Sequence, residues 1–300
     1  MNSTALIVWN SFLHSAPPDQ QSRLLHCISS ELIQELQALG FSNLDLDRGF
    51  GPIEEELPKI HHSWLSPLLR ALPENEIQLF LSALTPEQIK GLKHSLLFSN
   101  TLPTPSIIGQ EYLKHTLFEM ILETSPIAVS RRIADSEDLL PIACLPDDPL
   151  NAILDLSSTE ILSLIDLLGM HDLSVEIRHI IETSKLKEIY SLLSKAQTTF
   201  LKTLLHKKEA VSFKKMGLLA WNGDREALHS MLLQRGLNRI AKSLYEHSPS
   251  LLWYIAHRLD VEKGQLLIKL CTALDHPKAS ILLGDQVIEL IGAIKSHNPP

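Results

Sequence analysis

The chain has 300 residues, of which 44% are apolar and 21% charged, and this balance excludes both a disordered polypeptide and a protein built of membrane spans. Leucine occurs 58 times and valine only 6 times, and aromatic residues make up 5%. Because straight-chain residues favour helices whereas β-branched and aromatic residues favour strands, the composition predicts an all-α protein.

The net charge of −8 is unevenly distributed. Residues 1–177 carry 9 basic and 24 acidic side chains (−15), residues 178–242 carry 13 and 5 (+8), and residues 243–300 carry 5 and 6 (−1). This asymmetry favours opposed electrostatic faces, suited to head-to-tail contacts or to an acidic partner. The basic segment lacks an arginine cluster interleaved with stacking aromatics, so we expect no nucleic-acid partner.

The N-terminal part, residues 1–50, is predicted to be a helical domain. Apolar residues recur at helical spacing over residues 4–14 and again over 19–39, so two helices are expected. The stretch 41–58 lacks that period and contains glycine, asparagine, aspartate and proline, which predicts a loop. The first domain boundary is therefore placed in this loop.

The middle part, residues 59–100, is predicted to be a region of short helices separated by Pro67, Pro73 and Pro86. Thr85 is expected to cap a helix that begins at Pro86, because proline is well tolerated at the first helical position.

The C-terminal part, residues 106–300, follows a proline-containing linker and begins with an amphipathic pattern over 107–123. The remainder predicts helices of about 10 to 15 residues. Breaks between them are expected at Gly169, Ser184, Gly223, Gly236, Ser248-Pro249 and His276-Pro277.

A short internal similarity relates residues 72–81 to residues 145–154. Each copy starts with Leu-Pro and acidic residues and continues with paired apolar residues at helical spacing. Such recurrence favours a stack of short antiparallel helices in several domains, armadillo-like or HEAT-like in its C-terminal part. A leucine-rich helical bundle that shows the similarity by chance is the alternative.

Motifs for catalysis and for metal or phosphate binding are not found. The paired carboxylates, Asp147-Asp148 and Glu54 to Glu56, lie beside prolines, where helix capping or solvation explains them. The sequence therefore predicts no enzymatic activity, no cofactor and no metal site.

Cysteine spacing and the first residues bear on the compartment. Cys27, Cys144 and Cys271 lie more than a hundred residues apart, which predicts buried thiols in a reducing cytoplasm. Residues 1–10 lack the basic start and the long apolar run of a secretion leader, and no run elsewhere is long enough to span a bilayer. We expect a cytoplasmic protein without direct membrane insertion.

Trp253-Tyr254 is the densest aromatic position of the chain. A core anchor is the first interpretation, because Leu252, Ile255 and Leu259 accompany the pair at helical spacing. A protein-docking surface is the alternative, and the pair is kept as a candidate binding site.

Residues 150–209 contain a recognisable succession of apolar and charged residues. It consists of Ile153-Leu154-Asp155-Leu156-Ser157, Ile161, Leu164-Ile165, His171-Asp172-Leu173, Ile177-Arg178, Leu186-Lys187-Glu188-Ile189, Leu193-Ser194-Lys195 and Phe200-Leu201-Lys202-Thr203-Leu204-Leu205. This pattern resembles the C-terminal armadillo-like region of the flagellar rotor switch protein FliG. Several motifs of that family, the glycine-pair hinge, the Met-Phe-x-Phe element and the Glu-His-Pro-Gln motif, are not found here.

The resemblance implies where torque-generating charges would lie. Arg178 and Lys202 match basic positions of the ridge that contacts the stator in that family. Thr203 and Leu204 replace its acidic pair, and Ala196 replaces another arginine. The loss of these charges implies that the protein is a static component, which no longer forms alternating charge contacts with a stator.

By this resemblance, the protein is expected to be a structural adaptor at the cytoplasmic base of a type III secretion, flagellar-like apparatus. The implied partners are inner-membrane ring proteins and cytoplasmic switch or sorting-platform proteins, so a peripheral position at the cytoplasmic face of the inner membrane is expected. The alternative is a secreted bacterial effector or a stand-alone helical-repeat adaptor.

Binding through helix faces is the expected mechanism, and the candidates form a basic ridge. Its residues are Arg178, Lys185, Lys187, Lys195, Lys202, Lys207 and Lys208. A solvated helix face is the alternative for each of these lysines.

Overall fold

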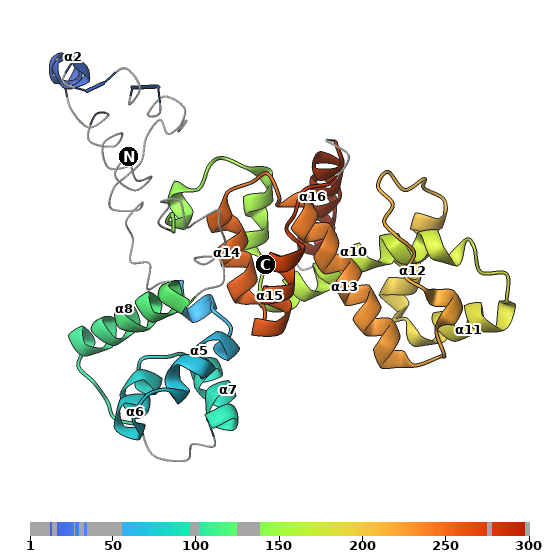
Figure 1. The fold of residues 1–300 in the computed structure, drawn as a ribbon, viewed down its shortest axis with the longest axis horizontal. Coiled ribbons are helices and arrows are strands. Elements are labelled where there is room, and N and C mark those ends of the chain that lie inside the picture. The colour runs from blue at the N-terminus through green and yellow to red at the C-terminus, as the bar shows by residue number, and fades with distance from the viewer. Residues whose placement is uncertain are drawn as a thin grey trace. The chain divides into compact units, whose positions relative to one another are not determined.

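The computed structural model describes residues 56–96, 102–124, 139–274 and 278–297, together with Leu13, 17–26, 28–29 and 33–34. Within these residues all regular structure is helical and no strand occurs, which confirms the all-α prediction (Figure 1). Two compact units are distinguished by their internal contacts, and each is described on its own.

The first unit comprises residues 1–148 and 248–264. Its helices are α2 (Pro18–His26), η2 (Leu57–Lys59), α5 (His62–Arg70), α6 (Glu74–Ser82), α7 (Pro86–Leu96), α8 (Ile107–Thr124), η3 (Ile142–Cys144) and α14 (Pro249–Arg258). Helix α5 contacts α6, α7 and α8, and α8 also contacts α6 (Figure 1). Fully buried leucines on these helices, among them Leu65, Leu81 and Leu117, form the core.

Helix α2 covers part of the predicted 19–39 helix. Apart from Leu13, the predicted 4–14 helix lies outside the described residues, as does the predicted loop up to residue 55. The helix predicted over 107–123 is confirmed by α8. The predicted amphipathic pattern holds only in its second half, because Leu117 and Ile121 are buried whereas Ile107, Ile108 and Tyr112 are exposed.

Prolines delimit α6 and α7 as predicted. Pro73 is the N-cap of α6 and Pro86 begins α7, while Thr85 and Gln88 cap each other's backbone N–H groups at 3.2 and 3.3 Å. The prediction that Pro67 separates helices is wrong, because Pro67 lies inside α5. Its missing N–H removes one helical hydrogen bond, and buried Trp64 and Leu69 hold the helix on either side of it.

The second unit comprises residues 149–247 and 265–300. Its helices are η4 (Pro149–Asp155), α10 (Ser158–Ile177), α11 (Thr183–Leu192), α12 (Lys195–Leu205), η5 (Leu218–Ala220), α13 (Arg225–Ser243) and α16 (Ala279–His297). The division between the units falls within α15 (Val261–Leu270). Helix α10 contacts α12, α13 and α16, so it is the central element of this unit.

Gly169 and Gly236 lie inside α10 and α13, so the predicted breaks at these residues are wrong. A Cβ atom at Gly236 would lie 1.8 Å from the carbonyl oxygen of Ile165, and one at Gly169 would lie 2.3 Å from that of Leu232. The two glycines therefore allow the backbones of α10 and α13 to touch where the helices cross.

The other predicted breaks have mixed outcomes. Gly223, with φ of +90°, precedes α13, and Ser248-Pro249 begins α14, as predicted. Ser184 instead lies in the first turn of α11, because the break falls at residues 178–182. His276-Pro277 lies outside the described residues. Helices α10, α13 and α16 have 20, 19 and 19 residues, longer than predicted.

The two similar segments place their apolar pairs in the core, since Phe80, Leu81, Ile153 and Leu154 are buried. The first copy forms an α-helix and the second a 3-10 helix, so they do not repeat one structure. The armadillo-like arrangement and the division into residues 1–50, 59–100 and 106–300 stay predictions.

Candidate protein-binding surface

Helix α12 carries two of the predicted binding lysines on a well-capped scaffold. The Ser194 hydroxyl accepts from the Gln197 N–H at 3.1 Å, and the Gln197 side chain accepts from the Ser194 N–H at 2.9 Å. Lys195 and Lys202 are exposed, and seven residues, or two turns, separate them. They therefore lie on the same side of α12, about 10 Å apart along its axis.

Four of the predicted cations are available for a partner: Lys187 on α11, Lys195 and Lys202 on α12, and Lys208 beyond α12. All four are exposed. In the described part of the chain, none of their ammonium groups forms an ion pair or a hydrogen bond. We refer to these four residues as the free lysines.

Arg178 holds the end of a helix, a role that the sequence prediction missed. Its Nη2 donates to the carbonyl oxygens of Leu204 at 2.9 Å and Leu205 at 3.3 Å, and also to that of Lys207. These carbonyls lie at the C-terminal end of α12, where carbonyl groups have no N–H donor within the helix and where the negative end of the helix dipole lies. The guanidinium therefore stabilises α12 instead of remaining free.

Lys185 and Lys207 also have partners inside this unit. The ammonium of Lys185 donates to the carbonyl of Leu219 at 2.7 Å, and that of Lys207 lies 3.3 Å from Oε1 of Glu289. The side chains of Lys207 and Glu289 are 65% and 69% exposed, so their pairing contributes little to stability.

Trp253 and Tyr254 are buried, with exposures of 2% and 3%, so their assignment as a docking surface is wrong. The ring of Trp253 stacks on His257 at 3.9 Å, and the Tyr254 hydroxyl donates to the carbonyl of Leu140 at 2.9 Å. Burial also raises the pKa of Tyr254. The first interpretation, a core anchor, is confirmed.

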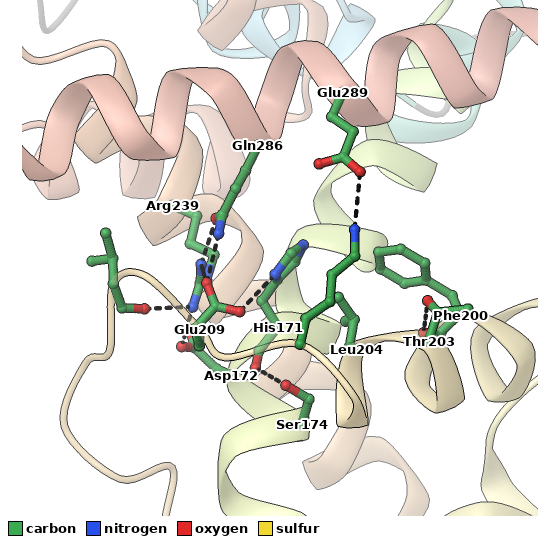
Figure 2. A network of polar contacts seen from close by, with 12 residues as sticks. His171, Asp172, Ser174, Phe200, Thr203, Leu204, Glu209, Arg239, Gln286 and Glu289 are labelled. Atoms are coloured by element: carbon green, nitrogen blue, oxygen red, sulfur yellow. Dashed lines mark hydrogen bonds and ion pairs between the residues drawn. The ribbon is translucent and has the colours of Figure 1, made fainter.

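A buried ionic network, which sequence reasoning missed, includes Glu209 and Arg239 of the basic segment 178–242 (Figure 2). Arg239 on α13 has an exposure of 0%. Its Nη2 lies 2.7 Å from Oδ1 of Asp172 on α10, and its Nη1 lies 3.1 Å from Oε1 of Glu209. Arg239 thus joins two helices to the segment that follows α12.

Glu209 receives further hydrogen bonds in this network. His171 Nδ1 lies 2.9 Å from its Oε2, and the Gln286 amide on α16 donates to its Oε1 at 2.6 Å (Figure 2). Burial alone would raise the pKa of Glu209, but the hydrogen bond from His171 and the charge of Arg239 outweigh it and lower the pKa to about 2. The carboxylate therefore anchors the backbone beside Lys207 and Lys208.

Part of this network could have been predicted from the sequence, because two of its charged residues lie on otherwise apolar helix stripes. Arg239 falls on the buried stripe of α13 that includes Leu228 and Leu232, and Asp172 falls on the stripe of α10 that includes Ile165. Opposite charges on two apolar stripes indicate a buried pair, since an unpaired charge in a core is costly. The side chains of Arg239, Asp172 and Glu209 are shielded from solvent. These three residues therefore hold α10, α13 and the segment after α12 together and are not a reactive site at the surface.

Comparison of the chain with family models, with curated proteins and with solved structures found no match. Within the described ranges, no helix is both long and apolar enough to cross a bilayer. Among those same residues, no three histidine, cysteine or carboxylate side chains gather closely enough to hold a metal ion.

Proposed function

We propose that the protein is a non-enzymatic adaptor that binds an acidic surface of a neighbouring protein through its free lysines. The observation that carries the proposal is the combination of exposure with missing counter-charges among the described residues at Lys187, Lys195, Lys202 and Lys208. Arg178 and Glu209 secure the helix end between them, so the lysines on α12 project from a rigid support.

Charge favours an acidic protein as the partner. The segment 178–242 has a net charge of +8, which attracts an acidic surface over roughly a Debye length and speeds encounter. Each lysine contributes little by itself, so binding depends on several of them and weakens as salt concentration rises.

The resemblance to FliG supports a place for this adaptor in a type III secretion, flagellar-like apparatus, at its cytoplasmic base. Inner-membrane ring proteins and switch or sorting-platform proteins are then the partners. A static role is supported by positions 203 and 204: the Thr203 hydroxyl donates to the Phe200 carbonyl at 2.7 Å, and Leu204 is 4% exposed. An acidic pair cannot be presented to a stator from these side chains.

Charge reversal tests the surface in the full-length protein. The variant Lys195→Glu/Lys202→Glu is compared with Lys269→Glu/Lys278→Glu, which changes the net charge equally at two exposed lysines elsewhere in the second unit. Tagged proteins are recovered from membrane fractions of the cells that produce the protein, and co-purifying apparatus components are quantified. We expect about a tenfold loss for the first variant only.

Two outcomes contradict the proposal. If no secretion or flagellar component co-purifies with the unchanged protein, the assignment to the apparatus is wrong. If both variants lose partners equally, the free lysines are not the binding surface. A fusion of the first 25 residues to a translocation reporter tests the alternative. Export of the reporter would indicate a secreted effector and would contradict an adaptor that stays in the apparatus.

A further inference from the structure

A cavity of about 280 Å³ lies in the first unit, whereas the free lysines belong to the second. It is formed where η2, the end of α6, the start of α7 and one side of α8 meet. Its polar lining includes Ser82, Thr85, Gln88, Gln110 and Lys114. This volume is at the lower end of the range for small-molecule sites, so a ligand for it is small.

The polar groups of α6 and α7 in this cavity are already used within the protein. Gln88, 5% exposed, donates to the carbonyls of Leu57 and Ile60, both at 2.8 Å, and its oxygen accepts from the Thr85 hydroxyl at 3.1 Å. The Ser82 hydroxyl donates to the Leu79 carbonyl at 2.6 Å. This side of the cavity is therefore neutral and rigidly held.

Helix α8 contributes the uncommitted donors. Gln110 and Lys114 are four residues apart, so they lie on one side of the helix, and both are only partly buried. Among the described residues, neither side chain has a hydrogen-bond or ion-pair partner, and Glu111, three residues before Lys114, is not paired with it. Lys114 is the one ionisable residue of the cavity lining.

Lys114 lines this cavity with a side chain that is only partly exposed, and among the described residues no carboxylate pairs with its ammonium group. An anion in the cavity would supply the missing counter-charge, and the amide of Gln110 would supply a second donor to a carboxylate oxygen. We propose that this cavity binds a small organic carboxylate, held by the Lys114 ammonium and the Gln110 side-chain amide.

Nitrogen-15 NMR of the full chain tests the site, because the Gln88 side-chain amide and the Thr85 backbone amide report from inside the cavity. The probes are succinate and its neutral counterpart succinamide, each titrated at low ionic strength to about 10 mM, a range that detects millimolar dissociation constants. We expect succinate, and not succinamide, to shift both signals.

Two variants and a matched control locate the charge. Lys114→Gln keeps the stem and removes the ammonium, and we expect at least a tenfold weaker response to succinate. Gln110→Leu is expected to weaken the response about threefold, whereas Lys90→Gln, at an exposed lysine on α7 outside the cavity, is expected to change it less than twofold.

Three results overturn the proposal. Equal shifts with succinamide would show that the cavity does not select a carboxylate. Equal losses in Lys114→Gln and Lys90→Gln would show that the anion acts through overall charge. No shift of either signal with succinate, acetate, citrate or inorganic phosphate would show that the cavity takes no small anion.

Discussion

Arg239 and Asp172 form an ion pair with an N–O distance of 2.7 Å, and their side chains are only 0% and 6% exposed. The arginine lies on α13 and the aspartate on α10, the two helices whose backbones touch at Gly169 and Gly236. Close backbone packing and a buried charge pair therefore occur at the same helix-helix interface in the centre of the second unit.

Loss of the Arg239 charge should be strongly destabilising. Arg239→Met leaves two buried carboxylates, Asp172 and Glu209, without their cation, and removal of one partner from such a network costs about 3–5 kcal/mol. The free energy of unfolding, from urea denaturation followed by circular dichroism, measures this. Arg235→Met is the control, because Arg235 donates to one backbone carbonyl at the surface, and its effect should stay below about 1 kcal/mol. If both variants lose a similar free energy of unfolding, the buried network does not stabilise the fold as proposed.

The network should also make stability depend on acid. The pKa of Glu209 is about 2 in the folded protein and 4.5 as its ordinary value, so the unfolded state binds more protons between these values. The stabilisation by the carboxylate is complete above pH 4.5 and is lost as the pH falls towards 2. We expect Glu209→Gln to lower the free energy of unfolding at pH 7, measured by urea denaturation. Between pH 4.5 and 3, the free energy of unfolding of this variant should fall less than that of the unchanged protein. An unchanged decline would mean that other groups cause it.

Glycine at the helix crossing should be indispensable. Gly236→Ala places a methyl group 1.8 Å from a backbone oxygen, which only a separation of α10 and α13 can relieve, so we expect a loss of at least about 3 kcal/mol. Gly292→Ala is the matched control in the interior of α16, since its new Cβ meets nothing within 4 Å. That change should stabilise by roughly 0.5–1 kcal/mol through helix propensity. Differential scanning calorimetry compares the two, and a tolerated alanine at residue 236 would contradict the close crossing.

The first unit should have an acid sensitivity of its own at His257. This side chain is fully buried between Trp64 and Trp253, and its Nδ1–H donates to the Trp253 carbonyl at 2.8 Å. Burial lowers the pKa of His257 to about 4, against the raising effect of that hydrogen bond. The ordinary value is 6.5, so the unfolded state binds the proton first and stability falls as the pH drops from 6.5 to 4.

Substitution of His257 separates its contribution from that of other groups. His257→Phe keeps an aromatic ring between the two tryptophans and removes the titrating imidazole. Between pH 6.5 and 4 we expect the free energy of unfolding of this variant to fall by about 3 kcal/mol less than that of the unchanged protein. Urea denaturation at both pH values measures the difference. Parallel pH profiles for the two proteins would show that the imidazole is not neutral and buried in solution.

Sequence periodicity and capping residues were sufficient to predict much of the local structure. The start of α7 follows from Thr85, Pro86 and Gln88, whose interactions span only three residues, and α8 follows from its apolar spacing. Gly169 and Gly236 were misassigned, because a glycine that ends a helix and one that lets two helices touch have the same local sequence properties.

By itself, the sequence determined that the chain is helical, that its positive charge concentrates in residues 178–242 and that α12 carries lysines at helical spacing. Only the tertiary structure decided which cations are free. Arg178 has acceptors 26 to 29 residues away, Arg239 has its partners 28 to 67 residues away, and Trp253 is buried in the core. Charge and helical periodicity are properties of neighbouring residues, whereas burial and counter-ions come from segments that meet only when the chain packs.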